Sequence, residues 1–156
     1  MTAPFPIRPA TPDDAPAIGA LVRSLARYFL ADSERPGDAE AFFRTLEPGV
    51  ITANLEGGRF RYHLADAEGV LAGVVGVRDG SHLYHLFVDE RFHRRGLASR
   101  LWEHARRDAE AAGNRGRWTV NASLAAVPLY ERLGFAATGP VVAQDGIAFR
   151  PMALGA

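Results

Sequence analysis

The segment "VDERFHRRGLASRL", residues 88 to 101, places two arginines and a glycine where an amphipathic helix begins. The first turn of a helix leaves backbone N–H groups unpaired and carries partial positive charge, so it favours a bound anion. Gly96 has no Cβ, which allows a ligand to approach the backbone closely, and Arg94 and Arg95 add positive charge. The pattern therefore predicts a diphosphate site between the end of a strand and the start of a helix.

The same residues, taken alone, also fit an ordinary helix start with arginines on a solvated face. Two other phosphate loops are excluded by pattern, because the chain has no G-x-x-x-x-G-K-[ST] and no G-x-G-x-x-G after a strand. The segment does resemble the acetyl-CoA-binding motif of the GNAT N-acetyltransferase superfamily, [RQ]-x-x-G-x-[GA] after a strand. The motif falls on residues 93 to 98, with His93 where the family has Arg or Gln.

A second segment, "NASLAAVPLYERLGF", resembles the later motif of the same family, N-x-x-A-x-x-[LF]-Y-x-x-x-G-F. Ser123 stands where Asn is often found, and Asn121 lies two residues earlier. The remaining matches are Ala126, Leu129, Tyr130, Gly134 and Phe135. The two motifs occur in the family's order, and the specific part of the resemblance lies between residues 83 and 135.

This resemblance implies an N-acetyltransferase that moves an acetyl group from acetyl-CoA to an amine, with Tyr130 as the general acid that protonates the departing thiolate. Because the chain has no cysteine to carry the acetyl group, direct transfer in a ternary complex is implied. Asn121 could hydrogen-bond the cofactor or a water, or could cap the following helix. The residues implied in cofactor binding are Leu86, Phe87, Val88, His93, Arg94, Arg95, Gly96, Leu97, Ala98, Ser99, Asn121 and Ser123.

The general base stays open between Asp32, Glu34, Tyr84, His85 and a water chain. The acceptor is a small-molecule or peptide amine, which the family resemblance brings in past "RYFLADSERPGD". Tyr28 and Phe29 with Asp32 and Glu34 would suit a cationic amine, although packing at a helix end explains them equally well. Tyr28, Asp32, Glu34 and His85 are therefore the candidate acceptor residues.

Several other partners are not expected. His82 and His85 should lie on opposite faces of a strand, which argues against a metal site. The arginines of residues 91 to 107 are interleaved with acidic residues, and the formal net charge is zero, which argues against nucleic acid. No apolar run could span a membrane and the N-terminal segment has no signal core, while the lack of cysteine fits the cytoplasm. A homodimer is one assembly that the sequence allows.

The elements that must position these residues follow from periodicity and turn signals. Helices are predicted over residues 11–30, 39–46, 94–113 and 124–133, and strands over 5–11, 117–123, three antiparallel segments within 56–90 and the segments after 134. The order predicts one α/β (α+β) domain over residues 1–156. It would have a GNAT-like, mixed, mostly antiparallel sheet of six to seven strands flanked by about four helices.

Two rival functions belong to other classes. A non-catalytic CoA-binding sensor or regulatory module on the same fold would keep Gly96 but would need no Tyr130. An arginine-rich nucleic-acid module would show salt-sensitive DNA binding.

Overall fold

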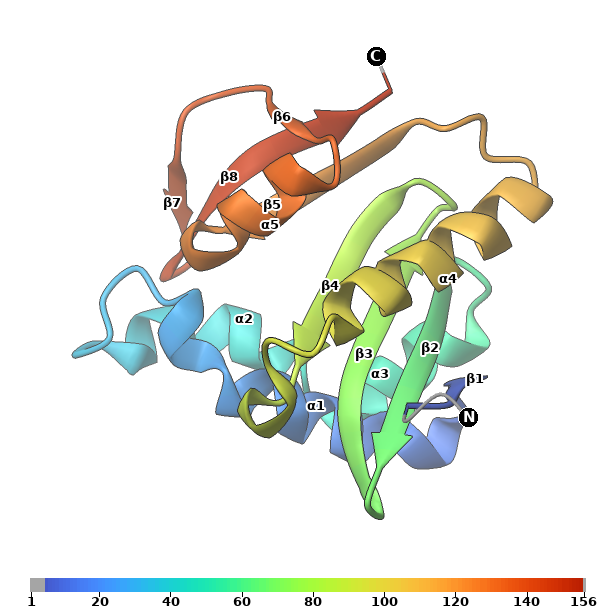
Figure 1. Ribbon diagram of the computed structural model, residues 1–156. Helices are drawn as coiled ribbons and strands as arrows, with labels where there is room; N and C mark the ends of the chain where they lie inside the picture. The colour runs from blue at the N-terminus through green and yellow to red at the C-terminus, as the bar shows by residue number, and fades with distance from the viewer. Residues whose placement is uncertain (1–4, 156) are drawn as a thin grey trace.

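The computed structural model describes residues 5–155 and contains a mixed sheet of eight strands (Figure 1). Residues 1–4 and 156 lie outside the described residues. The predicted domain includes all of them, and the N-terminal segment predicted to lack a signal core includes residues 1–4. The strands are β1 (Ile7–Pro9), β2 (Phe60–Ala67), β3 (Val70–Arg78), β4 (His82–Val88), β5 (Trp118–Ser123), β6 (Ala136–Ala137), β7 (Val142–Gln144) and β8 (Ile147–Leu154). The α-helices are α1 (Ala15–Ser24), α2 (Glu40–Arg44), α3 (Pro48–Glu56), α4 (Leu97–Ala111) and α5 (Val127–Arg132).

The sheet opens between β4 and β5. Its order is β1-β2-β3-β4-β5-β8-β6, with β7 paired to β8, and every pairing is antiparallel except that of β4 with β5. These two strands pair only at His82 with Thr119 and at Leu83 with Val120, and they then diverge (Figure 1). The later part of β4 therefore keeps β3 on one edge, while its other edge is free of a strand among the described residues.

A bulge in β4 changes which side chains face which way. His85 pairs with Gly76 and Leu83 pairs with Val77, so Tyr84 is an extra residue in the strand. As a result Leu83 packs into the core beneath α4, while the rings of Tyr84 and His85 lie together, with centroids 4.4 Å apart. The expectation that His82 and His85 lie on opposite faces is wrong, because the bulge adds one residue to the alternation between them.

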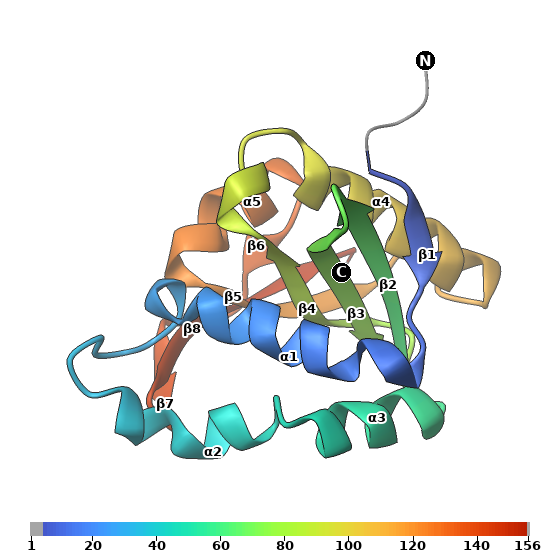
Figure 2. The same ribbon diagram turned by 90° about the horizontal axis from the view of Figure 1, so that it is seen from below.

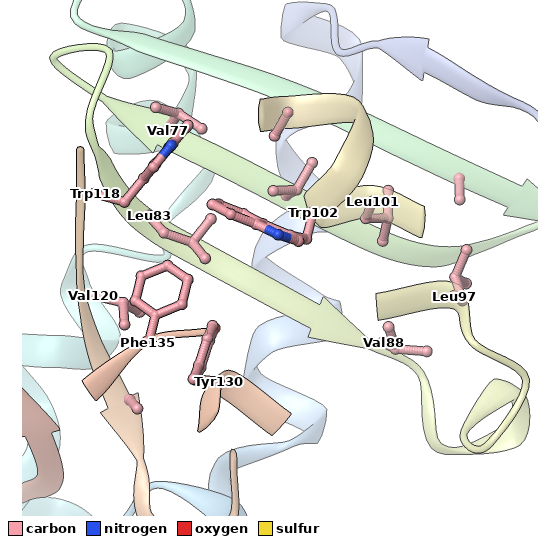
Figure 3. Close-up of a cluster of buried hydrophobic side chains, with 14 of the residues drawn as sticks. Val77, Leu83, Val88, Leu97, Leu101, Trp102, Trp118, Val120, Tyr130 and Phe135 are labelled. Atoms are coloured by element: carbon pink, nitrogen blue, oxygen red, sulfur yellow. The ribbon is translucent and has the colours of Figure 1, made fainter. Parts of the chain in front are cut away.

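Helix α4 covers one face of the sheet, and α1 and α3 cover the other (Figure 2). The apolar stripe predicted for residues 94–113 faces inward, with Leu97, Leu101 and Trp102 nearly inaccessible to solvent. Figure 3 shows Trp102 near Trp118 and Phe135, and Leu97 near Val88. The rings of Trp102 and Trp118 meet edge to face with centroids 4.8 Å apart. This packing holds α4 against β4 and fixes where the helix begins.

The predicted fold class is confirmed, with differences in individual elements. Helix α3 was not predicted, since Val50, Ile51 and Thr52 are β-branched and give a weak helical signal, although Pro48 suits its first turn. The count of eight strands exceeds the predicted six to seven because the C-terminal segment forms the short strands β6 and β7 as well as β8. Within residues 5–155, no helix is both long and apolar enough to cross a membrane.

Candidate active site

Two cavities meet where β4 and β5 diverge. The larger, of about 480 Å³, runs from β4 past the start of α4 to α5, and the smaller, of about 240 Å³, extends towards α2 and β8. Both are lined by Leu86, Phe87, Ser123 and Ala126, so they adjoin across the diverging ends of the two strands. Two ligands, one in each cavity, would therefore come into contact between these strand ends.

The turn before α4 presents its backbone to the larger cavity. Gly96 is the residue preceding the helix, and its φ of 73° lies in the left-handed region that favours glycine. A Cβ built on Gly96 would meet no atom of the described residues within 4 Å, so the space beside this backbone is open. Arg94 also has a positive φ, of 64°, and lines the same cavity. These features fit the anion site that the sequence predicted.

The other residues of the turn have different positions. His93 donates a hydrogen bond from Nε2 to the carbonyl oxygen of Val88, at 2.7 Å, and this bond holds the turn against the end of β4. The Arg95 guanidinium lies over the Phe92 ring, 5.5 Å from its centroid, and is not among the lining residues. The side chain of Leu97 is in the core, so only its backbone could contact a ligand. Arg132 of α5, which sequence reasoning missed, lines the cavity opposite this turn.

The remaining cofactor candidates divide between the two cavities. Asn121 lines the smaller cavity, and Ser123 lines both. The candidates lining the larger cavity are Leu86, Phe87, Val88, His93, Arg94, Gly96, Ala98, Ser99 and Ser123. Most of the predicted set therefore lies along one continuous surface.

The smaller cavity is walled mainly by aromatic side chains. It is closed by a contact that joins distant parts of the chain: the Ala31 N–H donates to the Gly146 carbonyl, and the Ala148 N–H donates to the Phe29 carbonyl, both at 2.9 Å. Among its lining residues, those that the sequence did not place in the site are Phe42, Thr45, Arg78, His82, Leu83, Val120, Ile147, Ala148 and Phe149. No local motif marks these residues, because the contact between the loop after α1 and the β7–β8 hairpin brings them together.

His85 lines the smaller cavity and is almost fully buried. Its Nδ1 is hydrogen-bonded to the Tyr62 hydroxyl at 3.0 Å, and its Nε2 has no partner within the described part of the chain. Burial lowers the pKa of His85 to about 3, so the ring is neutral at physiological pH. Among residues 5–155, no group of three or more His, Cys, Asp or Glu side chains could hold a metal ion.

Tyr130 lies in α5 with its ring against Phe135, the centroids being 5.4 Å apart at 71° (Figure 3). Its side chain is 4% exposed and lines the smaller cavity. Burial raises the pKa of Tyr130 above its ordinary value of 10.0, so the phenol keeps its proton at neutral pH. Because Tyr130 lines the smaller cavity, its protonated hydroxyl can act as a hydrogen-bond donor there.

The acidic candidates lie elsewhere. Asp32 and Glu34 are exposed in the loop after α1 and line neither of these two cavities. Tyr28 lines the larger cavity rather than the smaller one. Of the four candidate acceptor residues, His85 alone lines the smaller cavity.

Comparison with solved structures supports the same architecture. The GCN5-related N-acetyltransferase from Rhodopseudomonas palustris is 22% identical with a TM-score of 0.75, over 98% of this chain and 96% of that chain. PaiA N-acetyltransferase from Thermoplasma acidophilum, solved in complex with coenzyme A, is 15% identical with a TM-score of 0.74, over 98% of both chains. Spermidine N-acetyltransferase SpeG from Vibrio cholerae, solved as a point mutant, is 18% identical with a TM-score of 0.69, over 98% of this chain and 95% of that chain.

No curated protein matches the chain by sequence. A family model described as an acetyltransferase (GNAT) domain matches residues 30–156, which include both motifs, the diverging strands and most of the residues that line the two cavities. The chain therefore belongs to the GNAT acetyltransferase family.

Proposed function

We propose that this chain is a single-domain N-acetyltransferase that moves an acetyl group from acetyl-CoA to an amine by direct transfer in a ternary complex. The observation that carries the proposal is the pair of cavities that adjoin across Leu86 and Phe87. One cavity ends at a phosphate-type turn, and the other is a separate space into which an acceptor can fit. Two substrates held in this way could react without a covalent enzyme intermediate.

The residues of the larger cavity fit acetyl-CoA, which supplies an acetyl group activated as a thioester. Gly96 and the first N–H groups of α4 would bind the diphosphate, with positive charge from Arg94 and Arg132. The free edge of β4 from Leu86 to Val88 would provide backbone hydrogen bonds to the pantetheine arm and the acetyl carbonyl oxygen. A backbone N–H aimed at that oxygen would stabilise the negative charge that develops during transfer.

The chain's own groups would then manage two protons. The acceptor nitrogen, as a neutral amine, forms a bond to the acetyl carbon, and the carbon–sulfur bond breaks. Tyr130 donates its proton to the departing sulfur, and the nitrogen releases one proton. The products are an N-acetylated amine and CoA. The proton released by the nitrogen passes to solvent, and a proton from solvent replaces the one that Tyr130 donated.

The route of the amine proton is proposed to run through water in the smaller cavity. With its pKa lowered to about 3, His85 is a weak base, although it can accept or donate a hydrogen bond. Asp32 and Glu34 line neither of the two cavities, which argues against a direct role. Of the alternatives for the general base, the lining residues thus favour the water chain and Tyr84, which lines the same cavity.

Two-substrate initial-rate kinetics test this proposal, with release of CoA measured against a panel of amines. Direct transfer predicts reciprocal plots that intersect, whereas parallel lines would indicate a covalent acetyl-enzyme and contradict the proposal. Calorimetry with acetyl-CoA alone completes the test. Tight binding without turnover on any amine would instead support a CoA-binding sensor.

A further inference from the structure

We propose that the acceptor is a small amine that carries a carboxylate and an apolar side chain, as an α-amino acid with an aromatic or aliphatic side chain does, and that Arg78 binds the carboxylate. The inference rests on the proposed acetyl transfer and specifies the substrate class of the same site. It departs from the cationic amine that Asp32 and Glu34 suggested in the sequence.

Arg78 is a guanidinium without an adequate partner. Its Nε is buried and makes no hydrogen bond among the described residues. Its acidic neighbour, Asp79, lies 3.8 Å from Nε and is already bound by Arg59 through two hydrogen bonds of 3.0 and 2.8 Å. A buried donor left unpaired is costly, so Nε lacks an acceptor, while the side chain as a whole is 37% exposed and is open to a ligand.

The position of Arg78 directs it to the smaller cavity. Its guanidinium lies over the Tyr84 ring, 5.6 Å from the centroid, and Arg78 pairs with His82 across the β3–β4 hairpin. All three residues line the cavity. A planar guanidinium anchored on an aromatic ring can bind both oxygens of a carboxylate.

The charge of the cavity lining also favours an anionic group. Among the described residues, no Asp or Glu lines this cavity. The pKa values of His82 and His85 are lowered, chiefly because burial disfavours the charged rings. Arg78 therefore carries the formal positive charge of the lining at neutral pH, and a polycation such as spermidine would find no counter-ion there.

The same charge helps the chemistry of the acceptor. A nearby guanidinium disfavours an ammonium ion and so lowers the pKa of a bound amine. A carboxylate on the acceptor would be stabilised at Arg78 while the amine loses its proton more easily. This effect reduces the need for a strong general base in the cavity.

The walls of the cavity define the rest of the acceptor. Phe29 packs against Phe42 and Phe87, with ring centroids 4.9 and 6.0 Å apart, and these rings form an apolar surface. Tyr84 and Phe149 add two more aromatic rings to the lining. With a volume of about 240 Å³, the cavity suits a small molecule with an apolar side chain.

The experiment compares amino acids with their decarboxylated amines, which differ only in the carboxylate. The pairs are L-phenylalanine with phenethylamine, L-tryptophan with tryptamine, and L-leucine with isoamylamine. For at least one pair, the wild-type protein is expected to show kcat/KM about tenfold to a hundredfold higher for the amino acid. Arg78→Gln should remove that preference by raising KM for the amino acid, while leaving the decarboxylated amine little changed.

Arg61→Gln is the matched control. Arg61 lies on the neighbouring strand and pairs in register with Val77, but its guanidinium binds Asp108 of α4 at 3.0 Å. This substitution removes the same charge from the neighbouring strand, at a side chain that binds α4 and does not line the cavity, so it should keep the preference for the amino acid. Thermal unfolding and acetyl-CoA affinity of both variants would identify any general loss of folding.

Calorimetry of the N-acetylated amino acids with the CoA-bound protein measures binding without turnover. Arg78→Gln should raise the Kd of these ligands by about tenfold to a hundredfold, the same factor as the preference in kcat/KM. Equal use of each amino acid and its amine, with no Arg78-dependent binding, would overturn the inference while the acetyl transfer stands. Preference for spermidine or for O-phosphoethanolamine would also overturn it. Failure to bind acetyl-CoA, or the absence of turnover with every amine, would instead contradict the proposed function. Calorimetry of the N-acetylated amino acids with the protein alone, wild type against Arg78→Gln, would then test the carboxylate site separately.

Discussion

His85 Nδ1 lies 3.0 Å from the Tyr62 hydroxyl oxygen, at the bulge of β4, and no polar group of residues 5–155 pairs with His85 Nε2. Both side chains are almost fully buried. The bulge therefore brings a neutral imidazole into the wall of the smaller cavity, where a charged ring would be poorly solvated. The pH dependence of folding follows from this arrangement.

We predict that His85 makes the protein less stable in mild acid. Its pKa is about 3 in the folded protein and near 6.5 in the unfolded chain, so protons bind preferentially to the unfolded state. The part of the free energy of unfolding that depends on the neutral ring is fully present above pH 6.5 and is lost as the pH falls towards 3. Between pH 7 and pH 5 the loss should be about 2 kcal/mol, measured by urea unfolding.

His85→Gln provides the comparison, since glutamine does not titrate and can still hydrogen-bond Tyr62. The variant's free energy of unfolding should fall less between pH 7 and pH 5 than that of the wild type. The comparison uses the slopes, because the substitution also changes packing at every pH. Equal slopes would mean that His85 is accessible to protons in the folded protein.

A second prediction concerns the turn before α4. Gly96→Ala should weaken acetyl-CoA binding on the order of tenfold, because the methyl group would project into the open space beside the turn and disturb the diphosphate contacts. The positive φ of 73° should also cost about 1 kcal/mol in folding stability. Calorimetry with acetyl-CoA and thermal unfolding measure the two effects.

Gly69→Ala separates strain from obstruction. Gly69 has a φ of 78° and no atom of the described residues within 4 Å of a built Cβ, but it lies in the β2–β3 turn and lines neither cavity. It should lose similar stability and keep its affinity for acetyl-CoA. The proposed role of Gly96 is wrong if both variants bind as well as the wild type.

A third prediction distinguishes the arginines around the larger cavity. Arg94→Ala and Arg132→Ala should each weaken acetyl-CoA binding by about 1 kcal/mol, roughly fivefold in Kd, and should reduce its dependence on salt. Arg95→Ala is the matched control, since its guanidinium lies over Phe92 and does not line the cavity. Titrations at two salt concentrations measure these effects, and an equal loss for Arg95→Ala would contradict the assignment.

The local parts of the fold and site could be predicted from the sequence. The helix predicted over residues 94–113 and the strand predicted over residues 117–123 correspond to α4 (Leu97–Ala111) and β5 (Trp118–Ser123). These features depend on neighbouring residues alone. The helical signal of α3 was obscured by its β-branched residues, and the helix is held in place by contacts with α1 and β2, with Ile51 fully buried.

The acceptor side of the site could not be predicted in this way. Tyr84 became a bulge residue through the pairing of β4 with β3, and this register is a long-range property. Phe42 and Phe149 line one cavity where the β7–β8 hairpin contacts the loop after α1, and Arg78 reaches the same cavity from the end of β3. Asp32 and Glu34 carry the negative charge that would suit a cationic acceptor, but they lie in an exposed loop and line neither cavity.

The last prediction concerns Tyr130 and separates an enzyme from a CoA-binding sensor. Tyr130→Phe keeps the ring that packs against Phe135 but removes the hydroxyl that lines the smaller cavity. Turnover should fall by roughly 10²–10⁴-fold, mainly in kcat, because the proton moves only in the transition state. Thermal unfolding and the Kd for acetyl-CoA should change little.

The pH profile adds a second test of the same role. Because burial raises the pKa of Tyr130 above 10.0, loss of its proton should not reduce kcat at any pH below 10. A general acid with an unperturbed pKa would already lose activity as the pH approaches 10. If well-folded Tyr130→Phe retains full kcat, the sulfur receives its proton from another donor, and the acetyl-CoA site at Gly96 is left unaffected by that result.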